Sequence, residues 1–339
     1  MSMQEAENNL GVIAKSGSGA FKAEMDNTKA EDLSIIGQFG VGFYSAFMVA
    51  DKVTVLTRKY GEEKGVKWES SGADGYTVTE IDRETVGTDV IMHIKPDGEE
   101  KDEYSQYLRE YPLYKLVKKY SDYIRFPIRM LMPHPVKKEG SPEDKPEFEE
   151  VFEYEVLNSM VPLWQRKKSE VEKEEYDAFY RERFGEMAPP QSVITVSAEG
   201  AVTYKALLFI PSKAPGAYYT DEFQPGLQLY SSGVMIMEKC ADLLPECFRF
   251  VRGVVDSPDL SLNISREILQ HDRQLRIIGQ NLEKRIKGEL EKLMRDDRPK
   301  YQEFFRNFGT DLKCGVCDEY GRYKDFLRDL LIFYTSEDR

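Results

Sequence analysis

The chain has 339 residues, of which 41% are hydrophobic and 32% are charged, a composition typical of a globular protein with two or three domains. Its net charge of −13 argues against a general nucleic-acid-binding surface, because such a surface needs a basic face. No run approaches the ~18 consecutive apolar residues of a membrane span, and the N-terminus has neither the basic region nor the apolar core of an export signal. We therefore expect a cytoplasmic protein with no membrane or nucleic-acid partner.

The cysteines are too few for a disulfide scaffold at this length. Two of the four, Cys314 and Cys317, have the spacing of a zinc or redox motif, but no second cysteine pair or histidine pair follows them. With only three histidines and no Gly-x-Ser-x-Gly segment, a nucleophilic triad is also disfavoured. The sequence thus gives little support to metal, redox or triad chemistry.

The N-terminal third combines helices with a group of short strands. Apolar spacing predicts a helix over residues 3–14, and a glycine-rich segment at 37–42 precedes a further helical pattern. Alternating apolar residues bounded by turn residues then predict four strands, at 53–57, 66–69, 76–81 and 90–94. Their arrangement is typical of an antiparallel meander, one face of which the preceding helices would cover.

A helix and a charged segment follow these strands. An apolar stripe over 113–124 predicts a helix that opens at Pro112 and packs into a core. Residues 134–150 are charged and rich in proline, so they favour a linker or a long hairpin loop. We place a domain boundary there, between an N-terminal domain over 1–133 and a second domain over 151–339.

The second domain is predicted to be a layered α/β structure, because strands alternate with helices. Ser169 and Glu172 have the spacing of a capping box at the start of a helix, and residues 243–251 are predicted to form another helix. Strands are predicted at 193–196, 204–211, 227–230 and 234–237. Apolar residues three or four apart predict a long helix over 275–293, whose basic face is expected to be solvated, and a further apolar face over 301–308.

The segment from Gly37 to Ser45 is the stretch with the clearest chemical meaning. Its glycines lead into a helical pattern, and glycine lets backbone N–H groups approach an anion closely. A helix N-terminus behind such a turn is a ready phosphate site, because the free N–H groups and the helix dipole point the same way. The spacing fits neither a Walker loop nor a dinucleotide fingerprint. A phosphate-binding loop and a tight loop that packs a helix therefore both remain open on spacing alone.

Three long stretches carry a more specific signal. They are NNLGVIAKSG at 8–17, IGQFGVGFYS at 36–45, and RGVVDS at 252–257 together with LNISREILQ at 262–270. Further segments, among them Leu163-Trp164 and FIPSKAP at 209–215, extend the similarity over essentially the whole chain. In these motifs the chain resembles the Hsp90 family of heat-shock chaperones, in its bacterial HtpG branch.

The resemblance implies a mixed α/β (α+β) architecture. An ATP-binding sandwich of the gyrase and histidine-kinase (GHKL) type would be followed by an α/β layered middle domain with a long helix. ATP or ADP with Mg²⁺ would be the cofactors, and ATP hydrolysis would be the family's reaction. Catalysis of phosphoryl transfer to water is mostly positioning and charge stabilisation.

The resemblance also implies a set of nucleotide-binding residues. In the family's pattern Asn9 would help to hold nucleotide and Mg²⁺, Lys15 would lie near the phosphates, and Thr88 would help to fix the adenine. The backbone of the glycine segment would wrap the phosphates. The full implied set is Asn9, Lys15, Gly37, Gln38, Phe39, Gly40, Val41, Gly42, Phe43, Thr88 and Arg266.

Two residues of the second domain are implied to take part in catalysis. Arg266 matches the arginine that reaches the γ-phosphate, and Gln270 matches its polar neighbour. An arginine offers a planar, permanent charge to phosphate oxygens. The alternative for Arg266, without the family, is a structural ion pair with an acid such as Asp256.

The chain departs from the family's pattern at both ends. The pattern begins before Met1, with a glutamate that activates the attacking water and an aspartate that binds the adenine. It continues beyond Arg339, into a dimerisation domain. We therefore expect an incomplete nucleotide domain, an incomplete middle domain, impaired hydrolysis, and none of the family's homodimerisation through that domain.

The resemblance implies unfolded or partly folded client proteins as partners, with possible co-chaperones, and Trp164 is a candidate client contact. One alternative is a binding module that holds clients or co-chaperones without nucleotide. Another is a different ATPase of the same superfamily, such as a DNA topoisomerase or mismatch-repair subunit. The net charge of −13 and the Ser265-Arg266-Glu267 context disfavour that last alternative.

Overall fold

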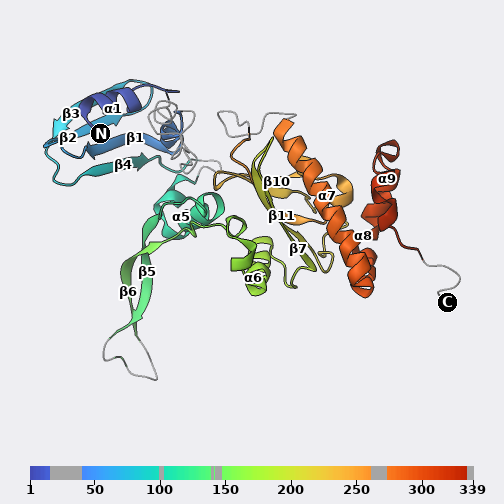
Figure 1. Ribbon diagram of the computed structural model, residues 1–339. Coiled ribbons are helices and arrows are strands. Elements are labelled where there is room, and N and C mark those ends of the chain that lie inside the picture. The colour runs from blue at the N-terminus through green and yellow to red at the C-terminus, as the bar shows by residue number, and fades with distance from the viewer. Residues whose placement is uncertain (16–39, 99–102, 139–140, 142–146, 261–272, 334–339) are drawn as a thin grey trace. The chain divides into compact units, whose positions relative to one another are not determined.

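The computed structural model describes the chain except for residues 16–39, 99–102, 139–140, 142–146, 261–272 and 334–339. The chain divides into two compact units (Figure 1). Unit 1 contains Met1–Val117 and Arg129–Glu155, and unit 2 contains Lys118–Ile128 and Val156–Arg339. The mixed α/β class that the sequence predicts is confirmed. The predicted domain limits, 1–133 and 151–339, stay a prediction.

Unit 1 is built on a four-stranded antiparallel sheet, and all four predicted strands are present. They are β1 (Ala50–Arg58), β2 (Gly65–Ser70), β3 (Tyr76–Ile81) and β4 (Gly87–Ile94). The predicted meander is wrong, because the strand order is β3-β2-β1-β4. β4 pairs with β1 along its whole length, which gives β1 hydrogen-bonded neighbours on both edges.

Helix α1 (Met3–Leu10) packs against this sheet. A capping box between Ser2 and Glu5 opens the helix. It ends at Leu10, four residues earlier than predicted, because Gly11 is its C-cap and Ala14 has a left-handed φ of 61°. The buried residues of the helix and the sheet form one core cluster, composed of Ala6, Leu10, Ala50, Val53, Val55, Val66 and Trp68.

The helix predicted over 113–124 differs in the structure. Helix α5 (Glu110–Leu116) is followed by a π-helical turn at Val117–Ser121. Leu116 and Tyr120 are exposed. The predicted apolar stripe is therefore not a single core-facing surface, because the wider π turn shifts the later side chains around the helix axis.

Two strands that the sequence does not predict lie on either side of residues 138–147. They are β5 (Arg129–Lys137) and β6 (Phe148–Val156), which pair as a two-stranded sheet. The glycine segment ends in a 3-10 turn at Phe43–Ser45 and the one-turn helix α4 (Ala46–Val49), directly before β1.

Unit 2 contains a five-stranded sheet in the order β10-β9-β11-β8-β7. The four predicted strands are β7 (Ser192–Ala198), β8 (Tyr204–Ile210), β9 (Leu227–Ser231) and β10 (Val234–Cys240). The central strand, β11 (Arg252–Asp256), is not predicted, and it runs parallel to β9 and antiparallel to β8. The helix predicted over 243–251 is wrong. Two 3-10 turns, Ala241–Leu243 and Glu246–Phe248, stand on either side of Pro245, whose ring nitrogen cannot donate to a helix.

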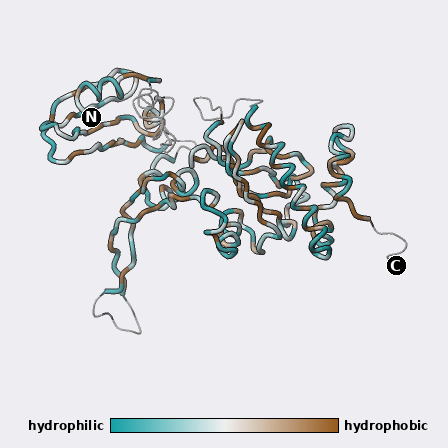
Figure 2. The backbone as a smooth tube through the Cα atoms, in the orientation of Figure 1, coloured by the Kyte–Doolittle hydropathy of each residue, from teal (hydrophilic) through white to brown (hydrophobic). Residues whose placement is uncertain are grey.

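Helices cover both faces of this sheet (Figure 1). One face packs with α6 (Lys173–Phe184). The other face packs in one core with α7 (Arg273–Asp296), α8 (Arg298–Cys317) and α9 (Lys324–Leu327). Along β8, Leu207 and Phe209 pack with α6, whereas Leu208 packs with α7 and α8. This alternation is what a strand buried on both faces requires. Figure 2 shows hydrophobic residues along the strands of this sheet.

The long helices follow their predicted apolar patterns. The buried residues at these positions are Leu275, Ile278, Leu282, Ile286 and Leu290 on α7, and Tyr301, Phe304 and Phe308 on α8. The predicted capping box of α6 is wrong. Ser169 lies in a separate 3-10 turn, and the box is formed by Glu172 and Glu175, whose side chains each accept from the other's N–H. Among the described residues, no helix is long and apolar enough to cross a membrane.

Candidate functional site

The structure describes part of the site that the sequence predicts, and this part lies in unit 1. Its described members are Asn9, Lys15, Gly40, Val41, Gly42, Phe43 and Thr88. The remaining predicted residues lie outside the described ranges: Gly37, Gln38, Phe39, Arg266 and Gln270. The known contacts of the site are therefore those of the first set.

Gly40 lies directly against the backbone of Lys15. Its φ of +66° is left-handed, and a Cβ atom at this position would be 2.5 Å from both the carbonyl carbon and the carbonyl oxygen of Lys15. Such a distance is far below van der Waals contact, and the neighbour is backbone, which cannot move aside cheaply. Glycine is therefore required here by both the conformation and the space. The contact brings the glycine segment and the predicted phosphate lysine together.

Two further contacts hold the glycine segment on unit 1. The hydroxyl of Tyr44 donates to the carbonyl oxygen of Leu10, at the last residue of α1, over 2.6 Å. The ring of Phe43 packs edge-to-face on Trp68, with 5.4 Å between the ring centroids. Trp68 belongs to the core of unit 1, so the segment is anchored both to the helix end and to the sheet.

Several backbone N–H groups of the glycine segment have no acceptor among the described residues. The carbonyl oxygens of Val41 and Gly42 accept from the N–H groups of Tyr44 and Ser45, over 3.0 and 3.3 Å. No described residue accepts from the N–H groups of Val41, Gly42 and Phe43. Successive free N–H groups at the start of a helical turn form the kind of concavity that binds anions.

Thr88 lies near the opposite end of α1. Its Oγ1 is 2.8 Å from Oγ1 of Thr57, and the same Thr57 oxygen accepts from the amino group of Met1 over 2.6 Å. Met1 precedes the first turn of α1, whereas Asn9 is in the last turn. An α-helix of 8 residues is about 12 Å long. The described site residues thus form two groups separated by about the length of α1, which suits an elongated ligand.

Glu5, on the first turn of α1, is not available as a general base. Its Oε1 pairs with Nζ of Lys59 over 2.6 Å, and its Oε2 accepts from the N–H of Ser2 over 2.8 Å. The hydrogen bond from Lys59, followed by that from Ser2, lowers the pKa of Glu5 below its usual value. A carboxylate held in this way is a weak base and has little freedom to reach a water molecule.

Trp164, the candidate client contact, is only 6% exposed and lies in the core of unit 2. Its indole N–H donates to Oδ2 of Asp256 over 3.1 Å, and its ring packs on Tyr123 with 4.6 Å between the centroids. This placement favours a packing role, because a buried indole presents little surface to another protein. The Asp256 carboxylate, the alternative partner for Arg266, also accepts from the side chain of Gln165 over 3.2 Å.

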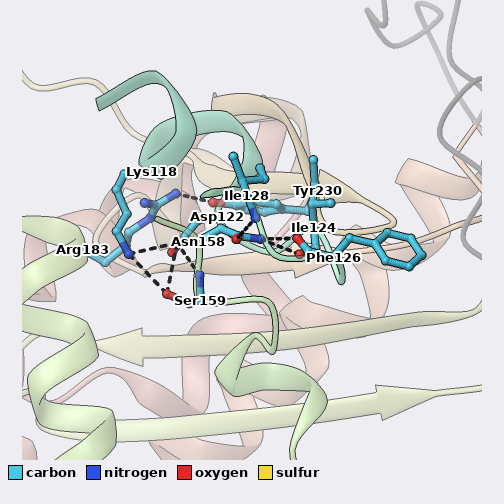
Figure 3. A network of polar contacts seen from close by, with 9 residues as sticks. All are labelled: Lys118, Asp122, Ile124, Phe126, Ile128, Asn158, Ser159, Arg183 and Tyr230. Carbon is cyan, nitrogen blue, oxygen red and sulfur yellow. Dashed lines mark hydrogen bonds and ion pairs between the residues drawn. The ribbon is translucent and has the colours of Figure 1, made fainter. Parts of the chain in front are cut away.

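A buried polar network that the sequence does not predict holds residues 118–128 in unit 2 (Figure 3). Its centre is Asn158, which is 4% exposed. The Asn158 side chain accepts from the N–H of Ile128 over 2.7 Å and donates to the carbonyl oxygens of Ile124 and Phe126 over 2.7 and 2.9 Å. One side chain thus satisfies three backbone groups of a turn far away in the sequence.

Asp122 forms the second part of this network (Figure 3). Its Oδ1 accepts from Nζ of Lys118 over 3.1 Å, and from the N–H and the hydroxyl of Ser159 over 2.9 and 3.0 Å. Beside it, the guanidinium of Arg183 bonds to the hydroxyl of Tyr230. Only the pair of Lys118 and Asp122, four positions apart, could have been suggested by local spacing. Ser159 lies 37 positions from Asp122, and no local pattern reveals it.

The cysteines give no sign of a metal centre. Among the described residues, no group of three or more His, Cys, Asp or Glu side chains has the arrangement of a metal site. Cys314 and Cys317 are exposed, whereas Cys240 and Cys247 are buried. Burial raises the pKa of the Cys247 thiol to about 12 and that of Cys240 to about 11, so both are neutral and unreactive near pH 7.

The fold and the glycine turn define a mixed α/β protein whose first unit has, next to the backbone of Lys15, backbone N–H groups without an acceptor among the described residues. Comparison with known sequences is more specific, because the Hsp90 protein family matches residues 137–339. The chain belongs to the Hsp90 family. It is 52% identical, over all of its 339 residues, to the chaperone protein HtpG of Alkaliphilus oremlandii (strain OhILAs), of Halalkalibacterium halodurans and of Bacillus subtilis (strain 168). The alignment covers 53% of each relative, so the chain spans about half the length of the curated relatives it matches.

Proposed function

We propose that this chain takes part in ATP-dependent protein chaperoning of the HtpG type, and that unit 1 binds ATP or ADP with Mg²⁺. Family membership supports the class of function. The observation that carries the nucleotide proposal is the turn at Gly40. There a left-handed glycine lies against Lys15, and the N–H groups that follow have no acceptor among the described residues. Bound nucleotide would supply the phosphoanhydride bond that the family hydrolyses.

The residues of unit 1 divide the work of binding between the two ends of α1. The N–H groups of Val41, Gly42 and Phe43, which have no acceptor among the described residues, would donate to phosphate oxygens. The ammonium of Lys15, whose backbone lies against Gly40, would balance the phosphate charge. Asn9, in the last turn of α1, would orient the phosphates and the hydrated Mg²⁺. The adenine would lie toward Thr88, about one helix length away.

Hydrolysis is proposed to be slow in this chain. Glu5 is held by Lys59 and by the helix cap, and its lowered pKa makes it a poor proton acceptor. Arg266 and Gln270 are proposed to contact the terminal phosphate, since a permanent planar cation is suited to charge that spreads over the phosphate oxygens. Nucleotide binding, and not turnover, is therefore the activity to measure first.

Client proteins are proposed to contact β6 and not Trp164. Phe148, Phe152, Tyr154 and Val156 occupy alternate positions of β6, so they share one face of the strand, and all four are exposed. The same face also carries the exposed Glu150, so three adjacent alternate positions, from Phe152 to Val156, form its apolar part. An apolar strand surface open to solvent is suited to unfolded or partly folded chains and to co-chaperones. Trp164 is buried and already bonded to Asp256.

The nucleotide proposal is tested by calorimetric titration of the full chain with Mg-ATP. In the Gly40→Ala variant the new methyl group would have to displace Lys15, so binding is expected to weaken by about tenfold to a hundredfold, the cost of losing one charge-assisted hydrogen bond. Gly61→Ala is the matched control. Gly61 has a similar φ of +86° but no heavy atom within 4 Å of the added Cβ, so it tests backbone strain alone. Absence of binding by the unsubstituted chain, or equal weakening by both substitutions, would contradict the proposal.

A further inference from the structure

Unit 2 contains a pocket of about 660 Å³ beside α8 that takes no part in the site described above. A volume in this range is typical of ligand sites, which span about 300–1,000 Å³. We call it the α8 pocket. Its lining residues are Arg298, Gln302, Phe305, Arg306, Gly309, Thr310, Lys313, Ile332 and Phe333.

The charges of the α8 pocket are all of one sign. Arg298, Arg306 and Lys313 line it, and no acidic residue is among the described lining residues. Within the described part of the chain, none of these three cations forms an ion pair. The protein as a whole carries a net charge of −13, whereas the charged residues among the described lining residues are all basic. The electrostatic potential in the pocket is therefore expected to be positive, opposite in sign to the net charge of the protein. An anionic ligand is the complement of this lining.

Of the acids at α8, Glu303 is not among the residues that line the pocket, and Asp297 and Asp311 have other partners. Asp297 accepts from the N–H of Lys300 as the N-cap and pairs with the Lys300 ammonium over 3.1 Å. Asp311 accepts from the buried hydroxyl of Tyr218 over 2.6 Å. Asp297 and Asp311 are therefore not available to neutralise the cations that line the pocket.

The pocket also has an apolar floor. A Cβ at Gly309 would be 2.8 Å from the ring of Phe305, which shows that the ring lies directly over the glycine. The ammonium of Lys313 lies 5.2 Å from the centroid of Phe305 and 5.6 Å from that of Phe333. A cation that contacts two aromatic rings is preorganised. It can bind a carboxylate while the rings bind the apolar groups beside it.

The spacing of the cations indicates an extended ligand. Arg298, Arg306 and Lys313 are eight and then seven residues apart on α8. An α-helix rises 1.5 Å per residue, so these intervals are about 12 Å and about 10 Å. An extended polypeptide rises about 3.3 Å per residue, so acids about three or four residues apart would face successive cations.

We propose that the α8 pocket binds an extended, acidic segment of a partner protein, with carboxylates three or four residues apart and apolar side chains between them. The cations select the carboxylates, and Phe305 and Phe333 contact the apolar side chains. A nucleic acid is the weaker candidate, because its long, dense charge would meet the net negative field of the rest of the chain.

The test uses a fluorescent eight-residue peptide, Asp-Ala-Phe-Ala-Asp-Phe-Ala-Asp, whose acids follow the two intervals. Its binding to the full chain is measured by anisotropy, beside the same peptide with Asn in place of Asp and a single-stranded thymidine octanucleotide. The pocket variant is R306E/K313E, and both side chains are exposed, so folding should survive. The matched control is R276E/K284E, which makes the same charge change at a similar spacing on α7, outside the pocket.

The acidic peptide is expected to bind the unsubstituted chain, and R306E/K313E is expected to weaken binding about tenfold or more, while R276E/K284E changes it less than about twofold. The Asn peptide should bind at least about tenfold more weakly. These comparisons between peptides need no variant, so they decide the question even if R306E/K313E does not fold. Equal losses in the two variants, equal binding of the two peptides, or tighter binding of the octanucleotide would overturn the proposal.

Discussion

Removal of the Asn158 side chain should destabilise unit 2 far more than a typical substitution of a polar residue. In Asn158→Ala, the N–H of Ile128 loses its acceptor and the carbonyl oxygens of Ile124 and Phe126 lose their donor. A hydrogen bond contributes about 0.5–1.5 kcal/mol net, and an unpaired buried group costs more. With three bonds lost at a site that is 4% exposed, we expect the free energy of unfolding of unit 2 to fall by about 2–4 kcal/mol.

The two tryptophans allow each unit to be followed separately. Trp68 lies in unit 1 and Trp164 in unit 2, and the chain has no others. In a Trp68→Phe background, urea unfolding followed by fluorescence reports on Trp164, whose ring packs on Tyr123 within the segment that the network holds. The reciprocal background, Trp164→Phe, reports on unit 1. Asn158→Ala should shift the Trp164 transition to lower urea and leave the Trp68 transition where it was.

Asn307→Ala is the matched control for this experiment. The Asn307 side chain also donates to two carbonyl oxygens, those of Ser212 and Glu303, over 3.2 and 3.0 Å, but it is half-buried and its bonds are longer. We expect a cost below about 1 kcal/mol. If Asn158→Ala costs no more than this control, or shifts both tryptophan transitions equally, the network does not carry the stability that its geometry implies.

Three further predictions concern charge, catalysis and client contact. Hydrogen bonds, chiefly from Lys67, lower the pKa of Glu69 to about 2, so its contribution to stability is present above the unfolded value of 4.5 and is lost as pH falls toward 2. The melting temperatures of the unsubstituted chain and Glu69→Gln should therefore differ most near pH 7 and converge near pH 2, and a difference that persists there would be contrary evidence. Arg266→Ala should slow any basal phosphate release from Mg-ATP by about a hundredfold or more with nucleotide affinity and melting temperature almost unchanged, whereas a loss of ~3 kcal/mol in stability would point to a structural ion pair. The double variant F152D/Y154D should lose the ability to suppress aggregation of an unfolded client without a change in melting temperature, since these side chains are 50% and 75% exposed, and full retention of suppression would rule out the β6 face.

The parts of the fold that the sequence predicts are those set by local spacing. The apolar stripe of α7 and the alternating burial along β1 each lie within one segment, so local spacing is enough to identify the element. The position of β4 beside β1, in contrast, is not set by local spacing. Local alternation predicts the strand but not its neighbour, which depends on pairing between residues 50–58 and 87–94. β11 is not predicted because the apolar run that precedes it is compatible with either a helix or a strand.

In the candidate site, too, features set by local sequence can be predicted, whereas features set by distant residues cannot. Asn9, Lys15 and the glycine segment belong to long motifs that resemble those of a family, and through that resemblance they predict a phosphate site, which stays a prediction. The burial of Trp164 could not be predicted, because the residues that pack on it, Tyr123 and Tyr230, and its hydrogen-bond partner Asp256 all lie far from it in the sequence. For Asn158 the sequence offers no signal at all, since its partners are backbone groups that could accept or donate to any amide.

The central position of β11 has a consequence for the synthesis of the chain. β7 with β8, and β9 with β10, are hairpins of neighbouring strands that can close as soon as they are made. Among the described strands, β11, which ends at Asp256, is the one that joins the two hairpins. Until that residue has left the ribosome, one edge of β8 and one edge of β9 have no partner, and open strand edges pair readily with other chains. A member of a chaperone family thus passes, during its own translation, through an interval in which it is itself open to misassembly.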